Sequence, residues 1–237
     1  MDTTQLEQIS DNVKRVREAI ETASRAADPA RAEGTVTLVA ASKTKPAEMI
    51  KAAIAAGVDA IGENRVQEMQ EKAPLSAYEG APLHFIGRVQ TNKINKIVGA
   101  CDLIESAGSR ETIERIAQRA KTLGITQSIL VEINIGREAQ KSGILPEQTS
   151  EILDIASRAG GIEVLGLMAI PPANDIFERS CNFFDEMHNL FIDMSGKKYD
   201  NVSMRFLSMG MSDSYVEAIK AGASMVRIGS AIFGHRG

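Results

Sequence analysis

The sequence predicts an α/β protein, a single (β/α)8 barrel with an extra helix at its N-terminus. Three observations lead to this fold class. After Gly34, eight short apolar runs alternate with longer segments of helical pattern, which is typical of a parallel sheet. The length of 237 residues suits one such barrel. Because no Gly-, Ser- or Pro-rich linker divides the chain, we expect residues 1–237 to form one domain, with the barrel over about residues 35–234.

The N-terminal segment predicts an amphipathic helix over about residues 4–27. Its apolar side chains recur at steps of three and four and form one stripe, which comprises Leu6, Ile9, Val13, Val16 and Ile20. The opposite face mixes acidic and basic residues, whereas a helix that lies on a membrane surface carries a strongly basic face. We therefore expect the stripe to pack on the domain and the helix to end at Asp28-Pro29.

The eight apolar runs are predicted strands, and helical segments lie between them. The strands are expected at residues 35–42, 60–64, 83–87, 103–106, 128–135, 163–170, 205–210 and 225–229. Helical character covers residues 46–56, 92–99, 109–123, 146–159, 175–194 and 212–221. An open doubly wound sheet satisfies the same alternation. The closed barrel is favoured because eight units and one leading helix in 237 residues match its usual size.

Composition and charge argue against nucleic-acid and membrane partners. The chain has 27 Lys and Arg against 31 Asp and Glu, a net charge of −4, and no Trp. Binding to a phosphate backbone needs a basic excess instead. No apolar run approaches the ~20 residues of a membrane-spanning helix. We expect a globular protein that binds neither nucleic acid nor membrane.

The cysteines and histidines suggest neither a metal site nor a disulfide framework. Cys101 and Cys181 lie far apart, and the three histidines have no further ligand at metal-binding spacing. His188 and His235 are expected at the surface, while His84 either lines a pocket or is a hydrogen-bonded structural residue. Since the N-terminus lacks the pattern of a signal peptide, we expect a reducing cytoplasm as the location.

The first predicted strand delivers a lysine to the face of the barrel that carries function, the C-terminal end of the strands. Lys43 follows this strand, and Pro46 can open the next helix at its first position. A partly desolvated lysine can act as an amine nucleophile and form a Schiff base with an aldehyde. A solvated lysine at a strand end is the alternative, which position alone favours.

The last two predicted strands are followed by loops that contain glycine and serine. Gly210 and Gly229 would let the backbone approach an anion, while Ser212 would cap the helix that it opens and add a hydroxyl. Barrels commonly bind phosphate between these two loops. Ordinary turn chemistry is the alternative at each loop taken singly.

Six motifs resemble, in order and spacing, the pyridoxal phosphate homeostasis protein family, whose TIM barrel is similar to the N-terminal barrel of alanine racemase. They are AASKTKP at 40–46, IGEN at 61–64, HFIGRVQTNK at 84–93, GLMAIPP at 166–172, SMGMS at 208–212 and MVRIGSAIFG at 225–234. The resemblance covers nearly the whole chain, from about residue 36 to residue 234.

The resemblance implies pyridoxal 5′-phosphate as the cofactor and Lys43 as the lysine that holds it as an internal aldimine. The remaining positions that match cofactor-binding residues of the family are Met211 (backbone), Ser212, Gly229 and Ser230 for the phosphate, Arg227 for the pyridine nitrogen, and Asn64 and Met168 for the pocket lining. Lys141 falls where relatives also carry Lys and is a further candidate, toward the ring hydroxyl.

Two positions depart from the family pattern. Ser214 stands where relatives usually have Asp, which puts the capping of the following helix in question. Ser230 stands where many relatives have Thr, and this change retains the hydroxyl.

The family resemblance implies storage and delivery of the cofactor to apo-enzymes, with no catalytic residue. Arg227 would leave the ring nitrogen unprotonated and so weaken the electron sink that carbanion chemistry needs. Racemisation also needs an opposing acid/base, which racemases take from a tyrosine in a second domain, and nothing places Tyr78, Tyr199 or Tyr215 there. An amino-acid racemase, a Schiff-base aldolase and an interaction scaffold stay open as alternatives. A monomer is expected.

Overall fold

The computed structural model describes residues 3–28, 34–172 and 177–234. Its eight strands follow one another in chain order as a closed parallel barrel. This strand order confirms the predicted fold class and excludes the open doubly wound sheet. The chain divides into two compact units, Met1–Phe85 with Gly210–Gly237, and Ile86–Met209.

The first unit contains four strands and the helices that accompany them. In chain order these are α1 (Thr3–Ala26), β1 (Thr37–Ala41), α2 (Ala47–Ala55), β2 (Ala60–Glu63), α3 (Val66–Lys72), the short 3₁₀ helix η1 (Ala73–Leu75), β3 (Leu83–Phe85), α8 (Tyr215–Lys220), β8 (Met225–Ile228) and α9 (Ser230–Phe233). β1 pairs in parallel with both β2 and β8, and β2 pairs with β3. The carboxyl ends of β1, β2 and β8 therefore lie at one edge of this part of the sheet.

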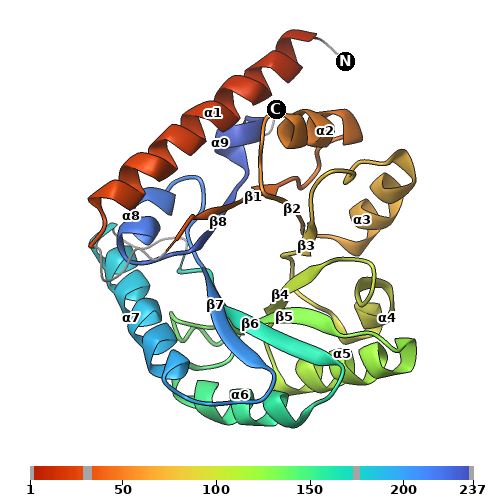
Figure 1. Cartoon of the computed structure of the whole chain (residues 1–237), viewed down its shortest axis with the longest axis vertical. Helices are drawn as coiled ribbons and strands as arrows, with labels where there is room; N and C mark the ends of the chain where they lie inside the picture. The colour runs from red at the N-terminus through yellow and green to blue at the C-terminus, as the bar shows by residue number, and fades with distance from the viewer. Residues whose placement is uncertain (1–2, 29–33, 173–176, 235–237) are drawn as a thin grey trace. The chain divides into compact units, whose positions relative to one another are not determined.

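The apolar stripe of α1 packs on the first unit, as predicted. Ile9, Val13, Val16 and Ile20 are buried, and α1 contacts α2, α8 and α9. Figure 1 shows the red α1 running beside the blue α8 and α9. The Asn12 side chain anchors this packing by donating a hydrogen bond to the backbone oxygen of Ile232 at 2.8 Å.

The second unit contains the other four strands, which pair in parallel in sequence order. Its elements are η2 (Thr91–Lys93), α4 (Ile94–Ile97), β4 (Leu103–Ala107), α5 (Arg110–Leu123), β5 (Gln127–Ile133), η3 (Pro146–Gln148), α6 (Thr149–Arg158), β6 (Ile162–Ala169), α7 (Phe177–Ser195) and β7 (Val202–Ser208). Close approach of β6 to β7 requires Gly166, because a Cβ there would lie 1.9 Å from the Phe206 carbonyl oxygen. No helix of the described residues is long and apolar enough to cross a membrane.

Four features of the fold differ from the sequence-based expectations. Helix α3 was not predicted, because its seven residues are too few for a clear apolar period. Helix α8 begins at Tyr215 and not at residue 212, since residues 211–214 form a turn in which two N–H groups donate to the Met211 oxygen. Pro46 occupies the N-cap of α2 in extended conformation and not its first turn.

The fourth wrong expectation concerns a histidine. His188 was expected at the surface, but it is buried. It lies on α7, which packs against β6 and β7, so its ring is turned to the interior of the second unit. His235 lies outside the described residues.

Candidate functional site

A cavity of about 580 Å³ opens at the carboxyl ends of β1, β2 and β8 in the first unit. Its lining contains seven of the eight positions that the resemblance assigns to the cofactor, namely Lys43, Asn64, Met211, Ser212, Arg227, Gly229 and Ser230. Parallel pairing explains why residues so far apart in sequence meet, because Lys43 follows β1, Asn64 follows β2 and Gly229 follows β8. The volume lies within the usual range of small-molecule sites, about 300–1,000 Å³.

Lys43 is half-buried and sits in a tight turn just after β1. The turn begins at Ser42, whose N–H donates to the Gly62 oxygen of the neighbouring strand region at 3.0 Å. It closes with a hydrogen bond from the Lys45 N–H to the Ser42 oxygen at 2.9 Å. Thr44 has a φ of 62°, the left-handed region that non-glycine residues adopt only at a cost.

Side chains from β2 and α3 form hydrogen bonds with this turn. Glu63 is fully buried, and its Oε1 accepts hydrogen bonds from Ser42 Oγ at 2.7 Å and Lys72 Nζ at 2.8 Å. Lys72 Nζ also donates to the Ser42 carbonyl at 3.2 Å and to Glu68 Oε2 at 3.0 Å. Glu68 Oε2 in turn accepts the Thr44 N–H at 2.6 Å. We call Glu63, Glu68 and Lys72 the turn-anchoring cluster.

Contacts within and beside this cluster shift the pKa of Glu68 and of Tyr78. Burial acts to raise the pKa of Glu68, but the hydrogen bonds from Thr44 and Lys72 and the nearby positive charges outweigh it, so the pKa lies below its ordinary value of 4.5. The Tyr78 hydroxyl donates a hydrogen bond to Glu63 Oε1 at 3.1 Å. Burial and the Glu63 carboxylate raise the pKa of Tyr78 well above its ordinary value. Glu68 is thus held charged and Tyr78 neutral.

Ser212 joins the two loops that were predicted to bind phosphate. Its Oγ accepts the Gly229 N–H at 3.2 Å and the Ala231 N–H at 3.3 Å. The expectation that Ser212 caps α8 was therefore wrong, because this hydroxyl serves the start of α9 instead. Ser214 stands at the N-cap of α8 without a capping hydrogen bond, and its Oγ accepts the Met211 N–H at 3.3 Å.

The two loop glycines differ in what they contribute. Gly210 has a φ of +94°, and a Cβ there would lie 2.6 Å from the Ala218 Cβ, so this glycine allows the loop to pack on α8. A Cβ on Gly229 would find its nearest atom, the Ala41 oxygen, at 3.4 Å. Only Gly210 is thus required by steric contact within the protein.

Electrostatics of the lining favour an anionic ligand. Of the described residues that line the cavity, Lys43, Lys45 and Arg227 are cationic and Asp213 alone is anionic. Arg227 is buried. Its backbone N–H donates to the Gly210 backbone oxygen at 3.1 Å and so connects β8 with the loop after β7. The Lys45 ammonium donates a hydrogen bond to the Phe233 backbone oxygen at 3.2 Å.

The remaining candidates lie elsewhere. Met168 is on β6 of the second unit and is fully buried. His84 is buried in β3, and the described residues that line the Lys43 cavity do not include it, which favours its structural role. Lys141, in the second unit, pairs with Glu138 at 2.5 Å and donates to the Pro171 oxygen at 3.4 Å.

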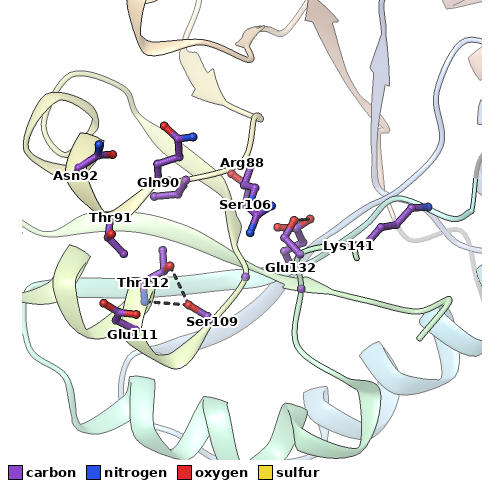
Figure 2. Close-up of a pocket in the computed structure, with 14 residues that line it drawn as sticks. Arg88, Gln90, Thr91, Asn92, Ser106, Ser109, Glu111, Thr112, Glu132 and Lys141 are labelled. Atoms are coloured by element: carbon purple, nitrogen blue, oxygen red, sulfur yellow. Dashed lines mark hydrogen bonds between the residues drawn. The ribbon is translucent and has the colours of Figure 1, made fainter. Parts of the chain in front are cut away.

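The second unit has a cavity of its own, of about 820 Å³ (Figure 2). Arg88, Glu132 and Lys141 are among the residues that line it. Figure 2 shows Ser109 and Thr112 joined by hydrogen bonds at the beginning of α5. Of the sequence-derived candidates, this cavity contains Lys141 alone.

Sequence reasoning missed the turn-anchoring cluster. A signal was present, because Glu63 ends an otherwise apolar buried strand, and a buried carboxylate requires a partner. Glu68 and Lys72 are spaced i, i+4, as helical ion pairs are. What the pattern lacked was any indication that this helix faces the Lys43 turn.

Comparison with known proteins agrees with this fold. Residues 5–237 match the family model described as alanine racemase, N-terminal domain. The chain is 36% identical over 230 residues to the pyridoxal phosphate homeostasis protein of Aquifex aeolicus, with 97% of each chain covered.

Two solved structures are similar along nearly their full length. A protein from Bifidobacterium adolescentis has a TM-score of 0.89 at 36% identity, covering 98% of this chain and 97% of that one. PipY of Synechococcus elongatus, solved with pyridoxal phosphate bound, has a TM-score of 0.80 at 28% identity, covering 95% of this chain and 100% of that one.

A closed parallel barrel with this family match is of the alanine racemase N-terminal-domain class. Within that class, the 36% identity to the Aquifex aeolicus protein over nearly the whole chain identifies one family. The chain belongs to the pyridoxal phosphate homeostasis protein family, as its motifs indicated.

Proposed function

We propose that this protein binds pyridoxal 5′-phosphate through Lys43 and serves its homeostasis by storing and delivering it, without turning over a substrate. The observation that carries the proposal is the single cavity that gathers seven predicted cofactor positions around Lys43. The cofactor bound to PipY and the printed name of the Aquifex relative support the choice of ligand.

The residues present fit each part of this cofactor. Its phosphate matches the cationic lining and the hydroxyls of Ser212 and Ser230, and its ring nitrogen matches the donor-only guanidinium of Arg227. When bound, the cofactor supplies an aldehyde. Lys43 is the amine that would hold this aldehyde as a Schiff base, with release of water.

Two features of the first unit support a carrier over a racemase. Arg227 leaves the ring nitrogen as an unprotonated acceptor, which weakens its capacity to stabilise a carbanion. Neither Tyr78 nor Tyr215 is among the described residues that line the cavity, and Tyr78 is engaged with Glu63. An opposing base from these tyrosines is therefore not in place.

The proposal extends to a cytoplasmic monomer that passes the cofactor to apo-enzymes. The buried Cys101 forms no disulfide with a described residue, which suits a reducing compartment. Size-exclusion chromatography with light scattering checks the monomer. Incubation with an apo-enzyme and assay of its recovered activity checks delivery.

Borohydride reduction tests the assignment of Lys43. Protein mixed with pyridoxal phosphate should show a visible absorption band, and reduction followed by peptide mass mapping should place the label on Lys43. Lys43→Ala should abolish both, whereas Lys51→Ala, at an exposed lysine of α2, should change neither. Label found chiefly on Lys45 or Lys141 would contradict the assignment, and the absence of any bound cofactor would favour the scaffold alternative.

A further inference from the structure

The two residues that flank Lys43 are both held by side chains of α3. On one side, Lys72 Nζ donates to the Ser42 carbonyl at 3.2 Å. On the other side, Glu68 Oε2 accepts the Thr44 N–H at 2.6 Å. A direct hydrogen bond between Lys72 and Glu68 at 3.0 Å joins these two anchors. The backbone of Lys43 is therefore fixed at both ends by one connected pair of charges.

Lys72 has no donor left for another role. Its ammonium has three N–H groups, and these meet Ser42, Glu63 and Glu68. Both Lys72 and Glu63 are buried, so each charge depends on the others for the hydrogen bonds that water would otherwise supply. All three Lys72 donors are thus engaged, while Glu63 Oε2 is buried without a hydrogen-bond partner among the described residues.

Thr44 shows what the cluster does to the turn. Its φ of 62° is unfavourable for a side chain with a branched Cβ, and such conformations persist only where the surroundings enforce them. The charge-assisted hydrogen bond from the Thr44 N–H to Glu68 is the contact that enforces it. Without that contact the turn can relax, and the direction in which the Lys43 side chain leaves β1 changes with it.

We propose that Glu68 and Lys72 are positioning residues for Lys43, which hold its turn so that the Lys43 amine, and not that of Lys45, meets the cofactor aldehyde. This inference rests on the proposed function for its chemistry. The placement of the turn by α3 is a property of the protein alone and can be measured without cofactor. A displacement of the order of 1 Å at a reacting group can cost about 100-fold in reactivity.

Substitution at Glu68 tests the proposal, with Glu71 as the matched control on the same helix. Glu68→Leu and Glu71→Leu place the same side chain on α3. They differ in position, because Glu68 is half-buried against the turn and Glu71 is exposed. In Glu68→Gln the side-chain oxygen still accepts the Thr44 N–H. Lys72→Met is a less suitable first variant, because removal of one buried charge leaves its partners uncompensated and endangers folding.

Amide hydrogen exchange in the cofactor-free protein is the first measurement. We expect the Thr44 amide to exchange at least about tenfold faster in Glu68→Leu than in the wild type, the order expected when one hydrogen bond to a charged group is lost. Glu71→Leu should keep the wild-type rate, and Glu68→Gln, which keeps the acceptor but loses its charge, should exchange more slowly than Glu68→Leu. Equal Thr44 exchange in Glu68→Leu and Glu71→Leu would overturn the positioning role.

Borohydride trapping is the second measurement. With limiting pyridoxal phosphate, Glu68→Leu should lose between about tenfold and 100-fold in the ratio of label on Lys43 to label on Lys45, and Glu68→Gln should restore the wild-type ratio. A wild-type ratio in folded Glu68→Leu also overturns the proposal. If the wild type itself carries no label on Lys43, the proposed function fails, while the exchange comparison still decides whether α3 fixes the turn.

Discussion

The serine hydroxyls beside Lys43 differ in their contacts. Ser212 Oγ accepts two backbone N–H groups, from Gly229 and Ala231, whereas Ser230 Oγ has no hydrogen-bond partner among the described residues. We predict that Ser212→Ala and Ser230→Ala each weaken cofactor binding by about 1–2 kcal/mol, because an anion at such loops is held chiefly by backbone N–H groups. Fluorescence titration measures this, and complete loss of binding in either variant would contradict it.

Unfolding experiments separate the two serines further. Ser212→Ala also removes the acceptor that connects the two loops, so it should lower the midpoint of thermal unfolding. Ser230→Ala, which removes no such contact, should leave that midpoint close to the wild-type value. Equal midpoints for the two variants would mean that the Ser212 bonds contribute no stability.

Glu68 makes the stability of the first unit depend on pH. Its pKa in the folded protein is lowered from 4.5, so its stabilising contribution is complete above the unfolded pKa and is lost as pH falls through the folded pKa. We predict that wild type exceeds Glu68→Gln in free energy of unfolding at neutral pH, and that the difference shrinks as pH falls below about 4.5. Urea titrations across this range measure it, and a difference that grows on acidification would show the wrong sign.

At the scale of elements, α1 is held to the first unit by its apolar stripe. Ile9 is 2% exposed on this helix. We predict that Ile9→Ala lowers the free energy of unfolding by about 2–5 kcal/mol, the usual cost of truncating a buried isoleucine. Glu7→Ala, on the exposed face, should change it by less than about 0.5 kcal/mol. Equal stability of the two variants would mean that α1 is not part of the core.

Helix α3 shows how an element can matter more than its length indicates. It has seven residues, yet it supplies both Glu68 and Lys72 to the turn that carries Lys43. Short helices of this kind are stabilised by tertiary contacts and not by intrinsic propensity. Their polar residues are therefore a better guide to function than their apolar period is.

For the whole molecule, we predict binding and transfer of the cofactor without turnover. Purified protein should be silent in racemase and transaminase assays, because general acid–base help alone is worth about 10²–10⁴-fold and no tyrosine is among the described residues that line the Lys43 cavity. The same preparation should restore an apo-enzyme. Racemisation at about 1 s⁻¹ or faster, abolished by Lys43→Ala, would overturn the carrier function and direct attention to the tyrosines.

The sequence by itself determined the fold class, the packed face of α1 and the family. These follow from local information: the period of apolar residues reports which face is buried, and alternating runs report a parallel sheet. Lys43, Arg227 and the loop residues were identified as cofactor positions by motif and strand end. All seven positions that the cavity gathers lie inside a motif named from the sequence alone. Their roles stay predictions.

Only the tertiary structure decided which groups act on one another. Ser42 and Lys72 are 30 residues apart, Thr44 and Glu68 are 24 apart, and Ser212 meets an N–H group 19 residues away. Hydrogen bonds over such separations leave no period in the sequence, because the distance between their partners is set by the packing of whole elements. For the same reason the burial of His188 and the start of α8 at Tyr215 became visible only in the folded chain.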